Sequence, residues 1–175
     1  VEHMVKPAVL GEDARDIAGL SHRLQQKFHL FGRYGITLFA LSGLDIALWD
    51  IAGKAAGMPL AQLLGGSADR SLPAYSSLFI LRDKEAVVRD VKRSLAEGYR
   101  YIKLHEIAEE EVGAARDAAG DDIPIMVDVN CPWTPEQAAR MALALDQFDL
   151  HWLEEPIFPP EDFASLARIR GETGV

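Results

Sequence analysis

The second half of the sequence contains three short β-rich stretches, and each one ends in polar residues that could do chemistry. Lys103 and His105 end the first stretch, Asp128 and Asn130 end the second, and Glu154 ends the third. Side chains two positions apart in a strand lie on the same face, so each pair is expected to point in one direction. These side-chain types offer proton transfer, hydrogen bonding and cation binding.

The spacing of these residues predicts that they meet. Lys103 and Asp128 are 25 positions apart, Asp128 and Glu154 are 26 apart, and each interval is the length of one strand and helix unit. Adjacent parallel strands bring their carboxyl ends to one rim, where α/β barrels carry their active sites. Two carboxylates at such a rim, without a Cys or His cluster, suit a hard cation such as Mg²⁺, which prefers oxygen ligands.

Two further residues lie beside these positions. Glu155 follows Glu154 and so points away from it or into the turn, and we expect it to support the site from behind or to be structural. Cys131 is the only cysteine and cannot form an internal disulfide, so we interpret it as a small packing residue. A reducing cytoplasm is the expected location.

The elements that position these residues alternate between strands and helices from about residue 72. Four such units in succession predict a parallel sheet, either an open doubly wound sheet or a (β/α) barrel. The start of the third helix is well specified, because Thr134, Pro135 and Gln137 stand at the N-cap, first and third helical positions. The predicted strands are 72–76, 101–105, 123–129 and 150–154, and the predicted helices are 84–97, 109–119, 135–145 and 160–169.

Residues 1 to about 70 have a different pattern, which predicts two helices joined by a turn. Apolar residues recur at helical spacing over 12–28, and a longer apolar helix over 35–56 is followed by Gly57 as a stop signal. Polar residues interrupt the apolar stretch at 36–51, which therefore falls short of the roughly 18 to 20 apolar residues of a membrane span. The first residues show no signal-peptide pattern.

Composition narrows the class of protein and of partner. The 175 residues are 49% hydrophobic and 26% charged, as in ordinary soluble globular proteins. A net charge of −9 argues against binding to nucleic acid, whose phosphates are held by an excess of Lys and Arg. We therefore expect a small-molecule ligand and neither a nucleic acid nor a membrane as partner.

Several motifs together resemble the mandelate racemase and muconate lactonizing branch of the enolase superfamily, in order and spacing from about Lys6 to the end. The resemblance implies an α/β fold, a (β/α)₇β TIM-like barrel, whose first four βα units are residues 71–175. Residues 1–70 would be the C-terminal helical part of an α+β capping domain. The motifs are residues 40–54, Leu-Leu-Gly-Gly at 63–66, Lys103-x-His105, Asp128-x-Asn130 and Trp-Leu-Glu-Glu-Pro at 152–156.

The resemblance also implies a metal site that this chain supplies only in part. Family members hold Mg²⁺ with three carboxylates on successive strands, and Asp128 and Glu154 fall on the first two positions. The third would lie one unit further on, at roughly position 180. We therefore expect these residues to belong to a longer polypeptide, to be inactive alone, and, as the family implies, to form a homo-oligomer.

The implied reaction removes the proton α to the carboxylate of a small acid, with Mg²⁺ neutralising the charge that develops on the carboxylate oxygens. His105 stands where the family usually has a second lysine as the base, and histidine ordinarily titrates near ~6.5 rather than ~10.4. Lys103 would add positive charge and is a second proton-transfer candidate, with its pKa lowered by the neighbouring cation. Asn130 would hydrogen-bond the substrate or a metal-bound water.

Several outcomes remain open after the proton leaves. Loss of water would make the protein a lyase, an acid sugar dehydratase, and the Glu-Glu-Pro sequence at 154–156 with Pro160 and Asp162 behind it favours this outcome. Reprotonation on the other face would make it a racemase or epimerase, and expulsion of an internal group a cycloisomerase. The His105 substitution also keeps open a non-catalytic member of the family.

Overall fold

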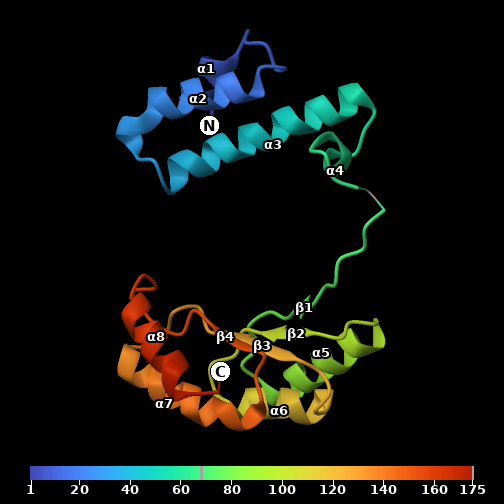
Figure 1. Cartoon of the computed structure of the whole chain (residues 1–175), viewed down its shortest axis with the longest axis vertical. Coiled ribbons are helices and arrows are strands. Elements are labelled where there is room, and N and C mark those ends of the chain that lie inside the picture. The colour runs from blue at the N-terminus through green and yellow to red at the C-terminus, as the bar shows by residue number, and fades with distance from the viewer. Residues whose placement is uncertain (68, 175) are drawn as a thin grey trace. The chain divides into compact units, whose positions relative to one another are not determined.

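The computed structural model describes residues 1–67 and 69–174 and divides the chain into two compact units, Val1–Ser71 and Leu72–Val175. The first unit is helical, and its two longest helices, α2 and α3, lie alongside each other (Figure 1). A small apolar core joins them, formed by Val5, Leu24, Phe28 and Leu41. The elements of this unit are α1 (Val5–Val9), α2 (Ile17–Phe28), the 3₁₀ helix η1 (His29–Phe31), α3 (Ile36–Ala56) and α4 (Leu60–Leu63).

Local capping decides where the helices of the first unit begin and end. The helix expected over 12–28 begins only at Ile17, because the Asp16 side chain accepts a hydrogen bond from the Gly19 N–H and caps it there. The predicted end of α3 at Gly57 is confirmed, since Gly57 has a φ of 63°, which glycine adopts without strain.

Helix α3 is long and apolar, and several of its apolar side chains are exposed. With 21 residues it is, by length and composition alone, long and apolar enough to cross a membrane, and 17% of its most apolar window is buried in the structure. Core helices of soluble proteins meet the same criteria. Apolar side chains of this helix that are exposed in the structure are Ile36, Phe39, Ile46 and Ile51.

The second unit is a parallel sheet with helices packed on one face (Figure 1). Its strands have the order β1-β2-β3-β4, so each unit adds beside the previous one. This is the order of a (β/α) barrel, whereas a doubly wound sheet reverses direction. The elements are β1 (Ser76–Ser77), α5 (Lys84–Ala96), β2 (Ile102–Leu104), α6 (Glu109–Ala119), β3 (Ile125–Asp128), α7 (Pro135–Leu145), η2 (Asp146–Phe148), β4 (Trp152–Glu154) and α8 (Phe163–Glu172).

The predicted elements of this unit occur in the predicted order, but the first strand and the last helix are displaced. The last helix was expected over 160–169 but is Phe163–Glu172, because the Asp162 side chain caps it there. The first strand was expected over 72–76 but is Ser76–Ser77. Ser76 pairs with Ile102, the first residue of β2, so the residues before Ser76 have no partner on that strand. The capping box of α7 is confirmed, because Thr134 Oγ1 accepts from Gln137 N–H at 3.3 Å and Gln137 Oε1 accepts from Thr134 N–H at 2.9 Å.

The helix-facing side of the sheet is the apolar core of this unit. Leu104 and Val127, which are paired across β2 and β3, are fully buried against α5 and α6 side chains such as Val91 and Val112. Because side chains alternate along a strand, the neighbours of Leu104 and Val127 point to the opposite face. That alternation puts the polar residues on the side of the sheet away from the helices.

Candidate functional site

The strand register arranges the polar face of the sheet in rows. Lys103 is paired with Met126 and Met126 with Trp152, which forms one row across three strands. Asp128 is paired with Glu154 in the next row, nearer the carboxyl ends of the strands. Lys103 therefore starts one row below the two carboxylates.

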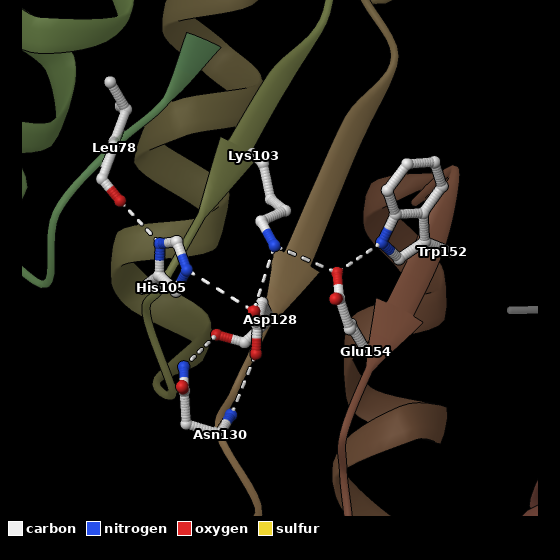
Figure 2. A network of polar contacts seen from close by, with 7 residues as sticks. All are labelled: Leu78, Lys103, His105, Asp128, Asn130, Trp152 and Glu154. Atoms are coloured by element: carbon white, nitrogen blue, oxygen red, sulfur yellow. Dashed lines mark hydrogen bonds and ion pairs between the residues drawn. The ribbon is translucent and has the colours of Figure 1, made fainter. Parts of the chain in front are cut away.

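The long side chain of Lys103 closes this gap. Its Nζ lies 3.0 Å from Asp128 Oδ2 and 3.1 Å from Glu154 Oε2 (Figure 2). The side chains of Lys103 and Asp128 are only 10% and 11% exposed, whereas that of Glu154 is 38% exposed. The structure thus brings together the three residues whose spacing predicted a common rim.

The ion pairs control the protonation of Lys103. Burial acts to lower its pKa, but the hydrogen bonds to Asp128 and Glu154 outweigh burial, and the pKa of Lys103 is raised above its ordinary value. The lowering expected from the sequence depends on a neighbouring cation and stays a prediction. With these two carboxylates as partners, Lys103 keeps its proton at neutral pH and acts as a positive charge.

His105 joins the same cluster from the end of β2. Its Nε2 lies 3.4 Å from Asp128 Oδ2, and its Nδ1 lies 2.5 Å from the carbonyl oxygen of Leu78, at the end of β1 (Figure 2). A carbonyl oxygen only accepts hydrogen bonds, so Nδ1 is the donor. The nitrogen left for chemistry is Nε2, which faces the Asp128 carboxylate.

Asn130 holds Asp128 from the other side. Its backbone N–H donates to Asp128 Oδ1 at 3.1 Å, and its side-chain Nδ2 donates to the Asp128 carbonyl oxygen at 3.4 Å (Figure 2). Asn130 has a φ of 58°, a conformation that Asn adopts more readily than most residues. The Asn130 side chain thus bonds its own strand end in this structure and helps to fix the direction of the Asp128 carboxylate.

Glu155 and Cys131 lie at the turns that follow the site. Glu155 is exposed with a φ of 50°, and its carbonyl oxygen accepts the Cys131 N–H at 2.7 Å. This bond links the ends of β3 and β4 beyond the carboxylates. Burial, together with the charges of Glu155 and Asp128, raises the pKa of the Cys131 thiol, which agrees with a packing residue rather than a nucleophile.

Two aromatic residues of the site were not predicted from the sequence. Trp152 Nε1–H donates to Glu154 Oε2 at 3.0 Å, the oxygen that Lys103 also contacts (Figure 2). The Tyr75 ring lies 5.9 Å from Lys103 Nζ and packs edge-on against Trp152. The signal for Trp152 is its position two residues before Glu154, which places both side chains on one face.

Asp128 and Glu154 provide two carboxylate ligands of the kind that a hard cation prefers. The Lys103 ammonium is a positive charge within about 3 Å of one oxygen of each carboxylate, so Asp128 and Glu154 already gather a cation. Glu154 Oε1 has no hydrogen bond within the described part of the chain. Residues 1–67 and 69–174 contain no group of three or more His, Cys, Asp or Glu that could hold a metal. The site offers two ligands of such an ion.

Comparison with known families agrees with the strand order of the second unit. Residues 86–175 match the family described as enolase C-terminal domain-like, and residues 1–65 match the mandelate racemase / muconate lactonizing enzyme N-terminal domain. The chain therefore belongs to the mandelate racemase and muconate lactonizing enzyme family of the enolase superfamily. Its second unit is the first part of a (β/α) barrel and its first unit the helical part of the capping domain.

Individual relatives have different activities. The chain is 40% identical to 3,6-anhydro-alpha-L-galactonate cycloisomerase of Streptomyces coelicolor, over 99% of this chain and 50% of the relative. It is 39% identical to L-talarate/galactarate dehydratase of Salmonella typhimurium, over 91% of this chain and 42% of the relative. The crystal structure of a racemase from Streptomyces coelicolor A3(2) with bound magnesium has a TM-score of 0.89 and 38% identity, over 99% of this chain and 50% of that one. The chain spans about half the length of the curated relatives it matches.

Proposed function

We propose that the protein containing this chain removes the proton α to the carboxylate of a sugar acid and eliminates water from the β position, as a magnesium-dependent dehydratase. The observation that carries the proposal is the cluster at the carboxyl ends of β2, β3 and β4. There Lys103 bridges Asp128 and Glu154, and His105 Nε2 faces the Asp128 carboxylate. One rim thus holds a cation-binding pair beside the fixed positive charge of Lys103 and the imidazole of His105.

Magnesium is the proposed cofactor, with Asp128 and Glu154 as two of its ligands. The donor set supports this choice, because carboxylate oxygens suit Mg²⁺, and a related structure contains bound magnesium. When bound, the ion would stabilise negative charge on the substrate carboxylate. We expect a third ligand from the part of the protein that its relatives have and this chain does not.

The residues of this chain have separate tasks in the proposed reaction. Lys103 supplies a fixed positive charge that attracts the substrate carboxylate into the rim. His105 accepts the α-proton at Nε2, while its Nδ1–H stays bonded to the Leu78 carbonyl oxygen. Asn130 holds the Asp128 carboxylate through its backbone N–H and offers its exposed side chain to the substrate. Glu155 supports the turn behind Glu154.

Cycloisomerisation is the second candidate, and the comparison with relatives favours it as strongly. Identity to the cycloisomerase is 40% and to the dehydratase 39%, so both outcomes occur among relatives at the same distance. Both start with removal of the same α-proton, as would racemisation or epimerisation. The group that leaves, or the face that is reprotonated, is decided by substrate contacts beyond this cluster.

We further propose that the protein is cytoplasmic, binds a small carboxylate and neither a membrane nor nucleic acid, and assembles as a homo-oligomer. A net charge of −9 and a single cysteine support the first two points. Light scattering of the purified full-length protein tests the third, and a monomeric mass would contradict it.

The proposed function is tested by incubating the full-length protein with Mg²⁺ and a panel of sugar acids in D₂O. A 2-keto-3-deoxy product indicates a dehydratase, whereas deuterium at the α-carbon without loss of substrate indicates a racemase or epimerase. A new cyclic or ring-opened isomer indicates a cycloisomerase. Absence of exchange and of product with every acid would overturn the proposal in favour of a non-catalytic member.

A further inference from the structure

A buried carboxylate lies directly behind His105 and takes no part in the proposed reaction. Glu106 is only 2% exposed and appears in no ion pair within the described part of the chain. Its two oxygens accept backbone hydrogen bonds instead, Oε1 from Leu81 N–H at 2.7 Å and Oε2 from Arg82 N–H at 3.1 Å. Burying a carboxylate costs free energy unless its oxygens accept hydrogen bonds. These two bonds satisfy the Glu106 carboxylate and indicate that its role is to hold the backbone of Leu81 and Arg82.

Both donors belong to the loop between β1 and α5. Consecutive N–H groups that converge on one anion form a concave backbone site, and the backbone of Arg82 has a positive φ of 50°. The bonds join residues 24 and 25 positions apart in the sequence. Glu106 therefore fastens the first loop of the rim to the end of β2.

The fastened loop carries the hydrogen-bond acceptor of His105. Leu78, three residues before Leu81, donates its N–H to the Lys103 carbonyl oxygen at 2.8 Å and accepts from His105 Nδ1 through its own carbonyl. The loop is thus held at Leu78 by β2 and at Leu81 and Arg82 by Glu106. With both ends fixed, the Leu78 carbonyl stays directed at the imidazole (Figure 2).

We propose that Glu106 is a positioning residue for His105. By fixing the loop that presents the Leu78 carbonyl, it keeps the neutral imidazole in the tautomer with hydrogen on Nδ1. The lone pair is then on Nε2, which faces Asp128 and the rim. An α-proton taken by His105 goes to this lone pair, and the Nδ1–H bond stays intact. This inference rests on the proposed function only for the consequence in catalysis, because the tautomer is a property of the protein alone.

The primary test is nitrogen-15 NMR of the full-length protein labelled in histidine, at alkaline pH, with the His105 signals assigned by their loss in His105→Asn. We expect one tautomer, protonated on Nδ1, in the wild type and in Glu109→Gln. Glu109 is an exposed carboxylate three residues further on, and its substitution is the matched control. In Glu106→Gln one oxygen is replaced by a donor that cannot accept an N–H, so we expect a mixture of tautomers.

The second readout is deuterium exchange at the α-carbon. Glu106→Gln should lower kcat for exchange roughly ten- to a hundredfold, the usual effect of losing a group that orients a reacting side chain, with KM and Mg²⁺ affinity unchanged. A single Nδ1–H tautomer and wild-type exchange in Glu106→Gln would overturn the proposal. If that variant does not fold, the wild-type spectrum decides, because hydrogen on Nε2 or a tautomer mixture contradicts the proposal and a single Nδ1–H form supports it.

The two hypotheses fail in different ways. If the wild type exchanges the α-proton of no sugar acid but the His105 tautomer depends on Glu106, the proposed function is wrong and the positioning role stands. If the wild type exchanges and Glu106→Gln changes neither readout, the positioning role is wrong and the proposed function stands.

Discussion

The Glu154 carboxylate accepts hydrogen bonds from two side chains on different strands. Its Oε2 accepts from Lys103 Nζ on β2 and from Trp152 Nε1 on its own strand. These bonds fix the direction of the carboxylate and leave Oε1 as the oxygen most available to a ligand. In metal sites, such orienting hydrogen bonds contribute strongly to affinity.

The indole of Trp152 should therefore matter for magnesium binding. In Trp152→Phe the ring is kept but the donor to Glu154 is lost, and we expect the Kd for Mg²⁺ to rise roughly tenfold. Isothermal titration of the full-length protein measures the change. Trp133→Phe is the control, since Trp133 packs against the core of the same unit without a side-chain hydrogen bond in the described chain. An equal effect of both variants would contradict the role of the indole N–H.

His105 is the residue on which the proposed proton transfer depends most directly. We expect His105→Ala to reduce deuterium incorporation at the α-carbon by at least about a hundredfold, which is the usual contribution of a general base. Mg²⁺ affinity should stay near that of the wild type, because His105 is not a proposed ligand. His3→Ala, a substitution of an exposed histidine, is the control. Substantial exchange in His105→Ala would show that a base from outside this chain removes the proton.

Among the helices, α6 is tied to the sheet by one buried cation. Arg116, 9% exposed, donates to the carbonyl oxygens of Gly120 and Ile123 before β3 and of Phe148 and Asp149 before β4, at 2.8 to 3.0 Å. The guanidinium thus closes the amino-terminal edge of the sheet, opposite the rim with the carboxylates. Its planar set of donors matches four carbonyls in a way that a lysine cannot.

Loss of this guanidinium should destabilise the second unit. Arg116→Met leaves four carbonyl oxygens without their donor, and we expect the free energy of unfolding to fall by about 3 kcal/mol. Arg116→Lys should recover only part of the loss. The exposed Arg140 on α7 provides the control, since Arg140→Met should change stability by less than about 0.5 kcal/mol. Urea denaturation followed by circular dichroism distinguishes the variants. Equal stabilities of Arg116→Met and the wild type would show that the Arg116 hydrogen bonds do not stabilise this unit.

The start of α8 should show a pH dependence of known sign. Hydrogen bonds from the Ser165 hydroxyl and then from its backbone N–H lower the pKa of Asp162 below its ordinary 3.8. A lowered pKa in the folded state means that the charged carboxylate stabilises the fold above pH 3.8 and that this contribution is lost as the pH falls through the lowered value.

Asp162→Asn keeps a capping side chain but removes the charge. We therefore expect the wild type to be more stable than Asp162→Asn at neutral pH and the difference to shrink below pH 3.8. The midpoints of urea unfolding of both proteins, recorded from neutral to acidic pH, measure this difference in stability. A difference that does not change with pH would show that the charge of Asp162 has no role in the cap.

At the scale of the whole molecule, the described residues form an open four-stranded sheet and contain no group of three or more residues that could hold a metal ion. In the described residues β1 and β4 each pair with one strand only, and the relatives are about twice as long. An isolated protein of residues 1–175 should therefore show no α-proton exchange under conditions in which the full-length protein does. The deuterium assay applied to both proteins measures this, and comparable exchange by the isolated chain would contradict the requirement for further ligands.

Residues close together in the sequence determined much of this structure in advance. Helices α6 and α7 have the predicted bounds. The start of α7 is fixed within one turn by the capping box of Thr134 and Gln137. The alternation of side chains along β2 and β3 also placed Lys103 and Asp128 on the face away from the helices. Such signals depend on local geometry and hold in any fold that contains the element.

Contacts between elements were decided only by the tertiary structure. The spacing of one unit predicted that Lys103 and Asp128 meet at one rim, but not their register. The register pairs Lys103 with Met126, and the length of the lysine side chain closes the gap to Asp128. The donors from Trp152 and Arg116 and the loop held by Glu106 join residues through packing. Register and packing are set by the burial of the whole sheet against its helices, which no short stretch of sequence encodes.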